Sequence, residues 1–443
     1  MPDAPTPTDL VDLLVLGGGM AGMTAAARAA RSGLRVAVVE RAPELGGSAQ
    51  FAGYLWTAPD TATMDEINPH GDPELKAAVV GRFADAVAFL RDLEVPVADA
   101  VTILRFGRGH AFDTSLYIDT CRRAVLAQGS VTTGAHTTKL TIDAEGRVSG
   151  ADLRLADGST HTVRAGATLL ATGGFQADAE LRARYVHAQA RDVALRSNPW
   201  SSGDGLRLAT EAGGAVTGEG SGFYGHLVPA HVDLEPEHFV DLALYYSEHA
   251  LLFNLAGERF VDETVGDHLT TMALLDQPEG RGLLVTDARG YREYITGSYV
   301  EGAPATDKFA LARRKGGRCV VADDADDFRA MPEEWGYDGE RIADEVARLA
   351  GGAPPSPPRT IDPRPLAEAP YYVVEVATAL TFPFAGIRID ARGRVLGASG
   401  DVVPGLYAAG SDVGGIYAGA YAGGIAAAAA TGLAAADDVV SAK

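Results

Sequence analysis

The chain has 443 residues, of which 47% are apolar and 22% are charged, and its formal net charge is −21. A chain of this length exceeds what one hydrophobic core usually serves, so we expect a globular protein of two domains. A surface with so much negative charge repels nucleic acid and anionic membranes, which excludes both as expected partners.

Neither the N-terminus nor the interior of the chain predicts export or membrane insertion. The segment 1–12 is acidic and lacks the basic and apolar regions of a signal peptide. No apolar run reaches the roughly 18–20 residues that cross a bilayer, and the closest, the Ala-rich segment 424–436, is only weakly apolar. Cys121 and Cys319 show no metal or haem spacing. We therefore expect a cytoplasmic protein without a metal site.

The first elements of the chain predict a strand–helix–strand unit. Residues 10–16 are a short apolar run, typical of a buried parallel strand. The glycine cluster 17–22 follows, and a helical stretch runs from it to Arg31. A second apolar strand, 34–39, ends at Glu40.

The glycine cluster has the spacing G-x-G-x-x-G at Gly17, Gly19 and Gly22. These glycines serve a tight turn, a close approach of the backbone to a pyrophosphate, and close packing of the helix on the strand. The helix N-terminus then offers free N–H groups to the phosphates. Glu40 can accept hydrogen bonds from a ribose hydroxyl, and its carboxylate would repel the 2′-phosphate of NADP. The motif predicts FAD or NAD.

Three further glycine elements favour FAD over NAD. They lie at 46–48, just past the ribose acid, and at the ends of two more predicted strands, 171–175 and 405–410. Close backbone approach at several points suits a ligand as extended as FAD.

The rest of the chain predicts an interrupted domain. A helical region at 73–93 is followed by an alternating stretch, 140–170, that is typical of a small antiparallel meander. From about 223 to 352, histidines, tyrosines and acids concentrate, and the Pro-rich segment 354–358 indicates a linker. After it the chain returns to strands and glycines.

We therefore predict an α/β fold: a three-layer, Rossmann-like FAD-binding domain, with a parallel sheet and an antiparallel meander, that an α+β domain interrupts. The predicted boundaries are 8–222 and 358–443 for the FAD-binding domain and 223–357 for the inserted domain.

The motifs, in this order, resemble one family, the fumarate reductase/succinate dehydrogenase flavoprotein-like superfamily, which includes the 3-ketosteroid dehydrogenases. The resemblance rests on Gly17–Gly22, Glu40, Gly46-Gly47, Ala171–Phe175, Ser202–Gly205, Asn254–Glu263 and Pro404–Gly415. It implies that the inserted domain caps the flavin and that the active site lies between the two domains. It also implies hydride transfer that creates or saturates a carbon–carbon double bond next to an activating carbonyl.

The resemblance also implies which residues bind FAD. The glycine loop and Glu40 would hold the pyrophosphate and ribose, and Gly47 and Ser48 would follow the ribityl chain. The helix that begins near Ile425 would point its N-terminus at the flavin pyrimidine edge. The full set of candidates is Gly17, Gly19, Ala21, Gly22, Glu40, Arg41, Gly46, Gly47, Ser48, Thr172, Gly173, Asp204, Gly410, Asp412, Gly424 and Ile425. Members with covalent FAD have a histidine just after the Gly-Gly element, and none occurs at 48–51, so we expect non-covalent FAD.

The expected substrate follows from two departures from the fumarate reductases, which bind a dicarboxylate with histidines and arginines. Their His-containing element is replaced by Thr381–Gly386, and Tyr421 stands where an arginine is expected. A tyrosine followed by glycines resembles the ketosteroid dehydrogenases, where a tyrosine and a glycine N–H hydrogen-bond the substrate ketone. Such donors stabilise the enolate that forms when the α-proton leaves. We predict that Tyr421 with the amide of Gly423 or Gly424 forms this oxyanion site.

A base must take the α-proton while the flavin takes a hydride from the β-carbon. The candidates are Tyr245, Tyr246 and His226 in the inserted domain and Tyr117 in the first half of the chain. The alternative for each tyrosine is a packing role, and the alternative for His226 is a hydrogen-bonded histidine of the core.

The expected function is an FAD-dependent desaturase that acts next to the carbonyl of a cyclic ketone, either a steroid or a smaller keto acid. One alternative is an enoate or enone reductase that uses the same machinery in reverse. Another is a flavin electron carrier without turnover, although a carrier has no need of a domain that caps its flavin. The expected partners are a small-molecule substrate and an external electron acceptor, which is oxygen, quinone or a redox protein.

Overall fold

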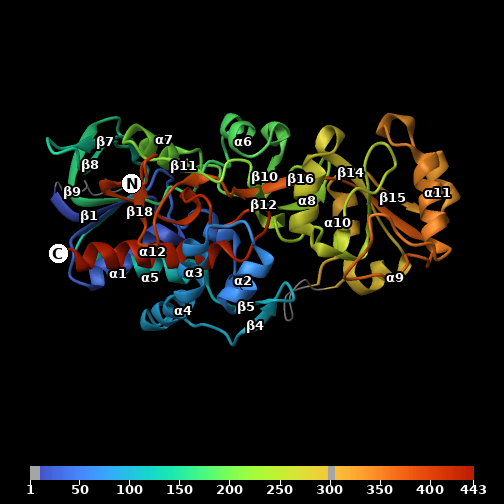
Figure 1. The fold of residues 1–443 in the computed structure, drawn as a ribbon, viewed down its shortest axis with the longest axis horizontal. Helices are drawn as coiled ribbons and strands as arrows, with labels where there is room; N and C mark the ends of the chain where they lie inside the picture. Colours follow the sequence, from blue (N-terminus) through green and yellow to red (C-terminus); the bar gives the residue numbers. More distant parts are fainter. Residues whose placement is uncertain (1–9, 298–304) are drawn as a thin grey trace. The chain divides into compact units, whose positions relative to one another are not determined.

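The computed structural model describes residues 10–297 and 305–443 (Figure 1). The predicted domain start at residue 8, and most of the N-terminal segment judged not to be a signal peptide, lie outside the described residues. The described chain forms two compact units. The first contains the residues up to Val186 together with Ser197–Phe223 and Phe382–Lys443, and the second contains His187–Arg196 and Tyr224–Thr381. The first and last described residues therefore both belong to the first unit.

A largely parallel sheet forms the centre of the first unit. Its strands lie in the order β18 (Arg394–Leu396), β19 (Val402–Ala408), β9 (Thr160–Leu170), β1 (Leu10–Leu16), β2 (Val36–Val39) and β6 (Ser130–Thr132). The neighbours from β19 to β6 pair in parallel. Two antiparallel strands, β7 (His136–Ile142) and β8 (Val148–Arg154), extend the sheet from β9 as the predicted meander. The carboxyl ends of β1, β2, β9 and β19 consequently meet at one edge, where open α/β sheets bind ligands.

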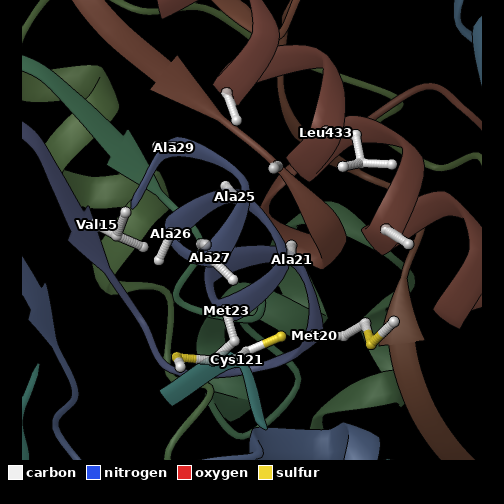
Figure 2. Packing of buried hydrophobic residues seen from close by; sticks show 14 of the residues in the cluster. Val15, Met20, Ala21, Met23, Ala25, Ala26, Ala27, Ala29, Cys121 and Leu433 are labelled. Atoms are coloured by element: carbon white, nitrogen blue, oxygen red, sulfur yellow. The ribbon is translucent and has the colours of Figure 1, made fainter. Parts of the chain in front are cut away.

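Small side chains allow the helices of the first unit to pack closely. Helix α1 (Met20–Arg31) is buried except at its arginines, and it packs on α12 (Gly424–Ser441) and α5 (Thr114–Leu126). Figure 2 shows the alanines of α1 beside Leu433 of α12. A Cβ atom on Gly432 would lie 2.5 Å from the carbonyl oxygen of Ala21, so this crossing requires a glycine.

Smaller elements complete the first unit. The predicted helical region at 73–93 is two helices, α3 (Pro73–Gly81) and α4 (Phe83–Asp92). The remaining elements are α2 (Thr61–Ile67), α6 (Ala179–Tyr185), α7 (Asp204–Glu211), the sheet of β3 (Tyr54–Thr57), β4 (Val101–Ile103) and β5 (Gly107–Ala111), and the pair β11 (Val216–Thr217) and β17 (Gly386–Ile387).

Within the described residues, α12 is the one helix that is long and apolar enough to cross a bilayer by length and composition. Two thirds of it, 67%, is buried inside the protein. Its alanines pack on α1, which is the setting of a core helix.

The second unit is built on the long strand β16 (Tyr371–Pro383). The sheet order is β10 (Ala194–Leu195), β16, β14 (Arg281–Thr286) and β13 (Leu251–Phe253), and β12 (Phe223–Pro229) and β15 (Cys319–Ala322) also pair with β16. The helices of this unit include α8 (Asp267–Leu275), α9 (Ala288–Gly290), α10 (Lys308–Arg314) and α11 (Gly339–Ala350). This mixture is the α+β architecture that was predicted.

The position at which the chain returns to the first unit differs from the predicted boundary. The main part of the second unit begins at Tyr224, next to the predicted start at 223, but it continues to Thr381 instead of 357. The segment His187–Arg196, which the prediction placed in the FAD-binding domain, also belongs to the second unit, because β10 pairs with β16. Strand β16 explains the difference, because its buried valines pair with β14 and β15. The Pro-rich segment is a connection inside the second unit, where Arg259 and Arg348 donate hydrogen bonds to the carbonyls of Pro357 and Pro354.

Candidate functional site

The three glycines of the loop after β1 have different structural roles. Gly17 has φ +112°, and a Cβ atom there would lie 2.0 Å from the carbonyl oxygen of Ala171. A Cβ atom on Gly22 would lie 2.0 Å from the carbonyl oxygen of Gly17. Gly19, by contrast, has only the carbonyl oxygen of Gly46 near this position, at 3.8 Å. The outer glycines therefore permit the fold, and the middle glycine leaves open space beside the N-terminus of α1.

This open space fits a phosphate group. Gly19 is the N-cap residue of α1, and no side chain caps the helix there. The N–H groups of the first helical turn thus lack a side-chain partner, and the helix dipole favours negative charge. The loop has the donors and the room that the pyrophosphate of a dinucleotide requires.

Glu40 is fixed at the end of β2 in a position suited to a ribose. One carboxylate oxygen accepts the N–H of Gly18 at 2.6 Å, and the other accepts the N–H of Ala42 at 2.7 Å. The residue is 8% exposed, and burial raises the pKa of its carboxyl group. A carboxylate can accept about four hydrogen bonds, so Glu40 keeps acceptor capacity for a ribose hydroxyl.

The other predicted glycine elements come together at the same edge of the sheet. The N–H of Gly46 donates to the carbonyl of Gly18 at 2.9 Å, and a Cβ atom on Gly47 would lie 3.4 Å from the Cα atom of Gly19. A Cβ atom on Gly410 would lie 2.9 Å from that of Ala21. Segments far apart in sequence thus surround the first turn of α1.

Several predicted cofactor residues hold these loops to one another. The buried carboxylate of Asp412 accepts hydrogen bonds from the N–H and hydroxyl of Thr172 and from the N–H of Gly174, and burial raises its pKa. Arg41 donates to Asp204 at 3.0 Å, and the hydroxyls of Ser48 and Ser197 lie 2.8 Å apart. The polar atoms of these residues already have partners within the protein, so their first effect is to shape the site. Gly173 lies in the same turn, with φ +94°.

Tyr421 lies at the N-terminus of α12. The N–H of Gly424 donates to its hydroxyl oxygen at 2.8 Å, and no side chain caps the helix, in which Ile425 is the second residue. The ring is buried against Trp56 and Tyr417, with centroid distances of 5.4 and 5.6 Å. We predicted two separate donors to one ketone. In the structure the Gly424 amide donates to the oxygen of Tyr421, and the oxyanion role of Tyr421 with the amide of Gly423 or Gly424 stays a prediction.

A small, partly open cavity lies beside this helix end. Aromatic and aliphatic side chains form much of its lining, together with the glycines at 410 and 424, and its described lining contains no charged side chain. The lining residues are Phe382, Pro383, Phe384, Gly410, Ser411, Val413, Ile416, Tyr417, Gly424 and Ala427.

In the second unit, His226 forms a buried polar chain. Its Nδ1 atom lies 2.5 Å from a carboxylate oxygen of Asp267, and its Nε2 atom lies 2.9 Å from the hydroxyl of Tyr224. The ring of Tyr245 is 5.1 Å from that of His226, edge to face. Burial raises the pKa of Tyr245 to about 12. The structure thus brings together two of the predicted candidates for the base.

The other two candidates belong to hydrophobic cores. Tyr117 is fully buried among residues of α1 and α5, where its hydroxyl lies 2.7 Å from that of Thr24. Tyr246 is buried in the core of the second unit, and its hydroxyl has no hydrogen-bond partner among the described residues. Burial raises the pKa of both hydroxyls. Both positions match the packing role that was the alternative, and a base at either of them stays a prediction.

Sequence reasoning missed Tyr224 and Asp267. Tyr224 and His226 are two residues apart on β12, so their side chains share one face of the strand. This spacing could have predicted that the two side chains lie together. Asp267 lies in the first turn of α8, 41 positions after His226, and no local pattern connects the two.

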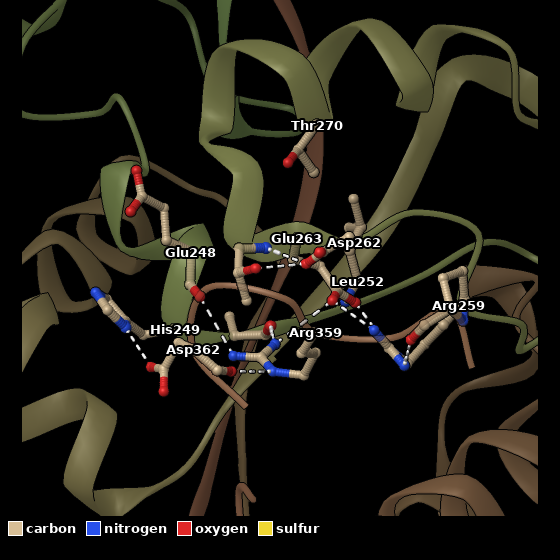
Figure 3. Close-up of polar contacts among 12 residues, drawn as sticks. Glu248, His249, Leu252, Arg259, Asp262, Glu263, Thr270, Arg359 and Asp362 are labelled. Carbon is tan, nitrogen blue, oxygen red and sulfur yellow. Dashed lines mark hydrogen bonds and ion pairs between the residues drawn. The ribbon is translucent and has the colours of Figure 1, made fainter. Parts of the chain in front are cut away.

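The motif at 254–263, part of the family resemblance, builds a buried ion network (Figure 3). Arg259 donates two hydrogen bonds to Glu263, at 2.8 and 2.6 Å, and Arg359 approaches the same carboxylate at 3.4 Å. Arg359 also donates to the carbonyls of Glu248, Ala250 and Asp362. All these partners belong to the protein, so the motif secures the second unit.

One group in the described residues brings possible metal-ligand atoms close together, namely the exposed Glu235 and Glu237 and the half-buried His238. Exposed acidic groups of this kind are common without an ion.

Comparison with known proteins agrees with this geometry. A family model described as an FAD binding domain matches residues 12–426. The fumarate reductase (cytochrome) of Shewanella frigidimarina is 27% identical over 94% of this chain and 74% of that protein. The vinyl phenol reductase of Lactiplantibacillus plantarum is 24% identical over 93% of this chain and 92% of that protein.

Among solved structures, the 3-ketosteroid delta1-dehydrogenase from Sterolibacterium denitrificans superposes with a TM-score of 0.78 at 17% identity. The match covers 98% of this chain and 100% of that one, which shows a shared fold. The predicted family resemblance is confirmed by the family model, which spans most of the chain, and the glycine loop and Glu40 supply the donors and acceptors that FAD needs. The chain belongs to the FAD-binding-domain family of flavoproteins, with the fumarate reductases among its relatives, and it is an FAD-dependent oxidoreductase.

Proposed function

We propose that the protein desaturates a cyclic ketone at the carbon–carbon bond next to its carbonyl. The substrate loses its α-hydrogen as a proton and its β-hydrogen as a hydride, and the double bond forms between these two carbons. Bound FAD supplies the hydride acceptor. An external acceptor, which is oxygen, quinone or a redox protein, then removes the electron pair from the enzyme.

The hydrogen bond from the Gly424 amide to the hydroxyl of Tyr421, at 2.8 Å, carries this proposal. Because the tyrosine oxygen accepts from the amide, its own proton is directed to a different acceptor. The amide also draws electron density from that oxygen, which makes the phenol a stronger donor. A substrate ketone that takes this proton as a hydrogen bond gains the stabilisation that its enolate needs.

The lining of the neighbouring cavity supports an uncharged substrate group. Rings such as Phe382 and Tyr417 and the absence of charge in its described lining suit an apolar ring better than a dicarboxylate, which needs cationic partners.

We also propose that FAD is held without a covalent bond. The segment after the Gly46-Gly47 turn, Ser48–Phe51, contains no histidine. In this arrangement the first turn of α1 binds the pyrophosphate, Glu40 binds a ribose, and the first turn of α12 meets the flavin ring. Acid precipitation that releases all the FAD into solution would support this proposal, and flavin that stays with the pellet would contradict it.

A second candidate function is the reverse reaction, reduction of an enone or enoate. The names of the two relatives, a fumarate reductase and a vinyl phenol reductase, favour it. Both directions pass through one transition state, so the same residues would serve either.

The decisive measurement is anaerobic bleaching of the flavin absorption by saturated cyclic ketones, including 3-ketosteroids and 4-oxocyclohexanecarboxylate. For a ketone that bleaches the flavin, Tyr421→Phe is expected to slow bleaching about 100-fold or more, since loss of one oxyanion donor costs this much. The FAD content should not change. Tyr407→Phe removes a hydroxyl of the same unit that donates to Asp438 near the other end of α12, and this control should keep most of the rate.

The outcomes separate the candidates. Full turnover by Tyr421→Phe with bound flavin would overturn the role of Tyr421. If no ketone bleaches the flavin but an enone or enoate re-oxidises the dithionite-reduced enzyme, the protein is a reductase.

A further inference from the structure

We propose that Tyr224 exchanges the substrate α-proton and that His226 and Asp267 position it and take up its own proton. This relay rests on the proposed chemistry next to a carbonyl and names the proton-transferring group that the chemistry requires. It is built entirely from residues of the second unit.

The geometry sets the direction of the relay. The carboxylate of Asp267 can only accept a hydrogen bond, so the proton of the 2.5 Å contact lies on Nδ1 of His226. A neutral imidazole then has a lone pair on Nε2, which accepts the hydroxyl proton of Tyr224 at 2.9 Å. Asp267 thus fixes the tautomer of His226, and His226 fixes the orientation of Tyr224.

The surroundings keep His226 neutral until it receives a proton. It is 1% exposed, and burial lowers its pKa, assisted by the positive charges of Arg196 and Lys308 and opposed by Asp267. The ring of Tyr245 packs on the His226 ring edge to face. Another titratable residue, His268, follows Asp267 directly in the chain. An imidazole that is neutral at pH 7 is ready to act as a base.

The proton transfer balances in one step. As the α-carbon–hydrogen bond breaks, its proton forms a new O–H bond on Tyr224, and the original hydroxyl proton moves to Nε2 of His226. The imidazolium that results is stabilised by the carboxylate of Asp267. The electron pair of the broken bond enters the enolate, and the hydride leaves from the β-carbon to FAD.

Tyr224 is better suited to this role than the other candidates. Both ring nitrogens of His226 already have partners, so the imidazole reaches a substrate only through Tyr224. Burial raises the pKa of Tyr245 to about 12, and Lys308 lies over its ring at 5.2 Å. Tyr224 is half-buried, so its side chain, unlike that of His226, is partly open to solvent.

The first test does not depend on activity. In FAD-loaded protein with ¹⁵N-labelled histidine, the signals of His226 are assigned by comparison with His226→Gln. The relay predicts a neutral ring with a protonated Nδ1 at pH 7 to 8. In Asp267→Asn the Nε2–H tautomer should appear, because an amide can also donate to Nδ1. A doubly protonated ring at pH 7, or an Nε2–H tautomer in the parent, would overturn the relay.

The second test measures proton transfer. Tyr224→Phe is expected to slow flavin bleaching by the active ketone about 100-fold or more, the usual contribution of a general base. The control Tyr245→Phe, which leaves the chain of hydrogen bonds intact, should stay within about fivefold of the parent, below the range of such contributions. FAD content and melting temperature are measured for both variants. If Tyr224→Phe keeps more than a tenth of the parent rate, the relay is overturned.

The two proposals can fail separately. If ketones do not bleach the parent flavin, the desaturase fails, and the same variants are compared in re-oxidation of the reduced enzyme by an enone, where Tyr224 donates the proton. If no carbonyl compound of either kind reacts, the ¹⁵N result still decides whether the chain of hydrogen bonds exists.

Discussion

Replacing Gly17 with alanine is expected to destabilise the FAD-binding unit severely, whereas replacing Gly19 with alanine should leave its fold intact and weaken FAD binding. A Cβ atom at Gly17 meets a backbone oxygen at 2.0 Å, and φ is +112°. Backbone does not move aside cheaply, so Gly17→Ala should cost about 3 kcal/mol or more. At Gly19 a Cβ atom meets nothing closer than 3.8 Å, and it occupies the space assigned to the pyrophosphate.

The measurements are thermal unfolding of the apoprotein and the dissociation constant of FAD. Gly19→Ala should melt within a few degrees of the parent and bind FAD about tenfold more weakly or worse, a loss of about 1.4 kcal/mol. Gly33→Ala is the matched control, because Gly33 has φ +87° with nothing within 4 Å of a Cβ atom. It should cost about 1 kcal/mol through backbone strain alone and leave FAD binding unchanged. Unaltered FAD affinity in Gly19→Ala would place the pyrophosphate elsewhere.

The FAD-binding fold could be predicted because its signals are local. The apolar run at 10–16, the glycine loop and the acid at Glu40 follow one another within 31 positions, and each has a distinct physical cause. The predicted strand 10–16 is β1 as observed, and the predicted helix to Arg31 ends there in the structure. Local patterns of this kind survive tertiary packing because every level of structure favours the same outcome.

The boundary at residue 358 could not be predicted in the same way. The run Tyr371–Val376 has the apolar character of the strands of the first unit, and the preceding prolines suggest a linker. This strand belongs to the second unit because it pairs with β14 and β15. Pairing between strands so far apart in the chain cannot be inferred from a local sequence pattern.

The parts of the candidate site that a backbone motif defines were predictable from the sequence. The parts that depend on which side chains are buried were not. The glycines and Tyr421 lie in recognisable spacings. Nothing in the local sequence distinguishes Tyr117 and Tyr246 from Tyr224 and Tyr245. In the structure, however, Tyr117 and Tyr246 belong to hydrophobic cores. The pairing of His226 with Asp267 joins strand β12 to the first turn of α8, which only the folded chain reveals.

Replacing Glu263 with glutamine is expected to destabilise the second unit more than any exposed substitution would. The side chains of Glu263 and Arg259 are 0% exposed, and that of Arg359 is 3% exposed. Glu263 also accepts the N–H of Leu252 at 2.9 Å, which ties the network to β13 (Figure 3). An uncharged amide leaves two buried guanidinium groups without their carboxylate. Breaking a buried pair in this way costs about 3–5 kcal/mol.

Such a loss should lower the melting temperature of the second unit by roughly 10 °C. The control is Glu345→Gln, which breaks a surface pair between the half-buried Glu345 and the exposed Arg348 one helical turn apart and should change stability by less than about 1 kcal/mol. Denaturant unfolding of both variants, followed by near-UV circular dichroism and by flavin fluorescence, separates the two units. FAD should stay bound at temperatures where the second unit of Glu263→Gln has melted. If the second unit of Glu263→Gln unfolds at the same temperature as that of the parent, the guanidinium groups have found other acceptors. The three carbonyls that already accept from Arg359 are then the first candidates, since they would stabilise its charge without the carboxylate.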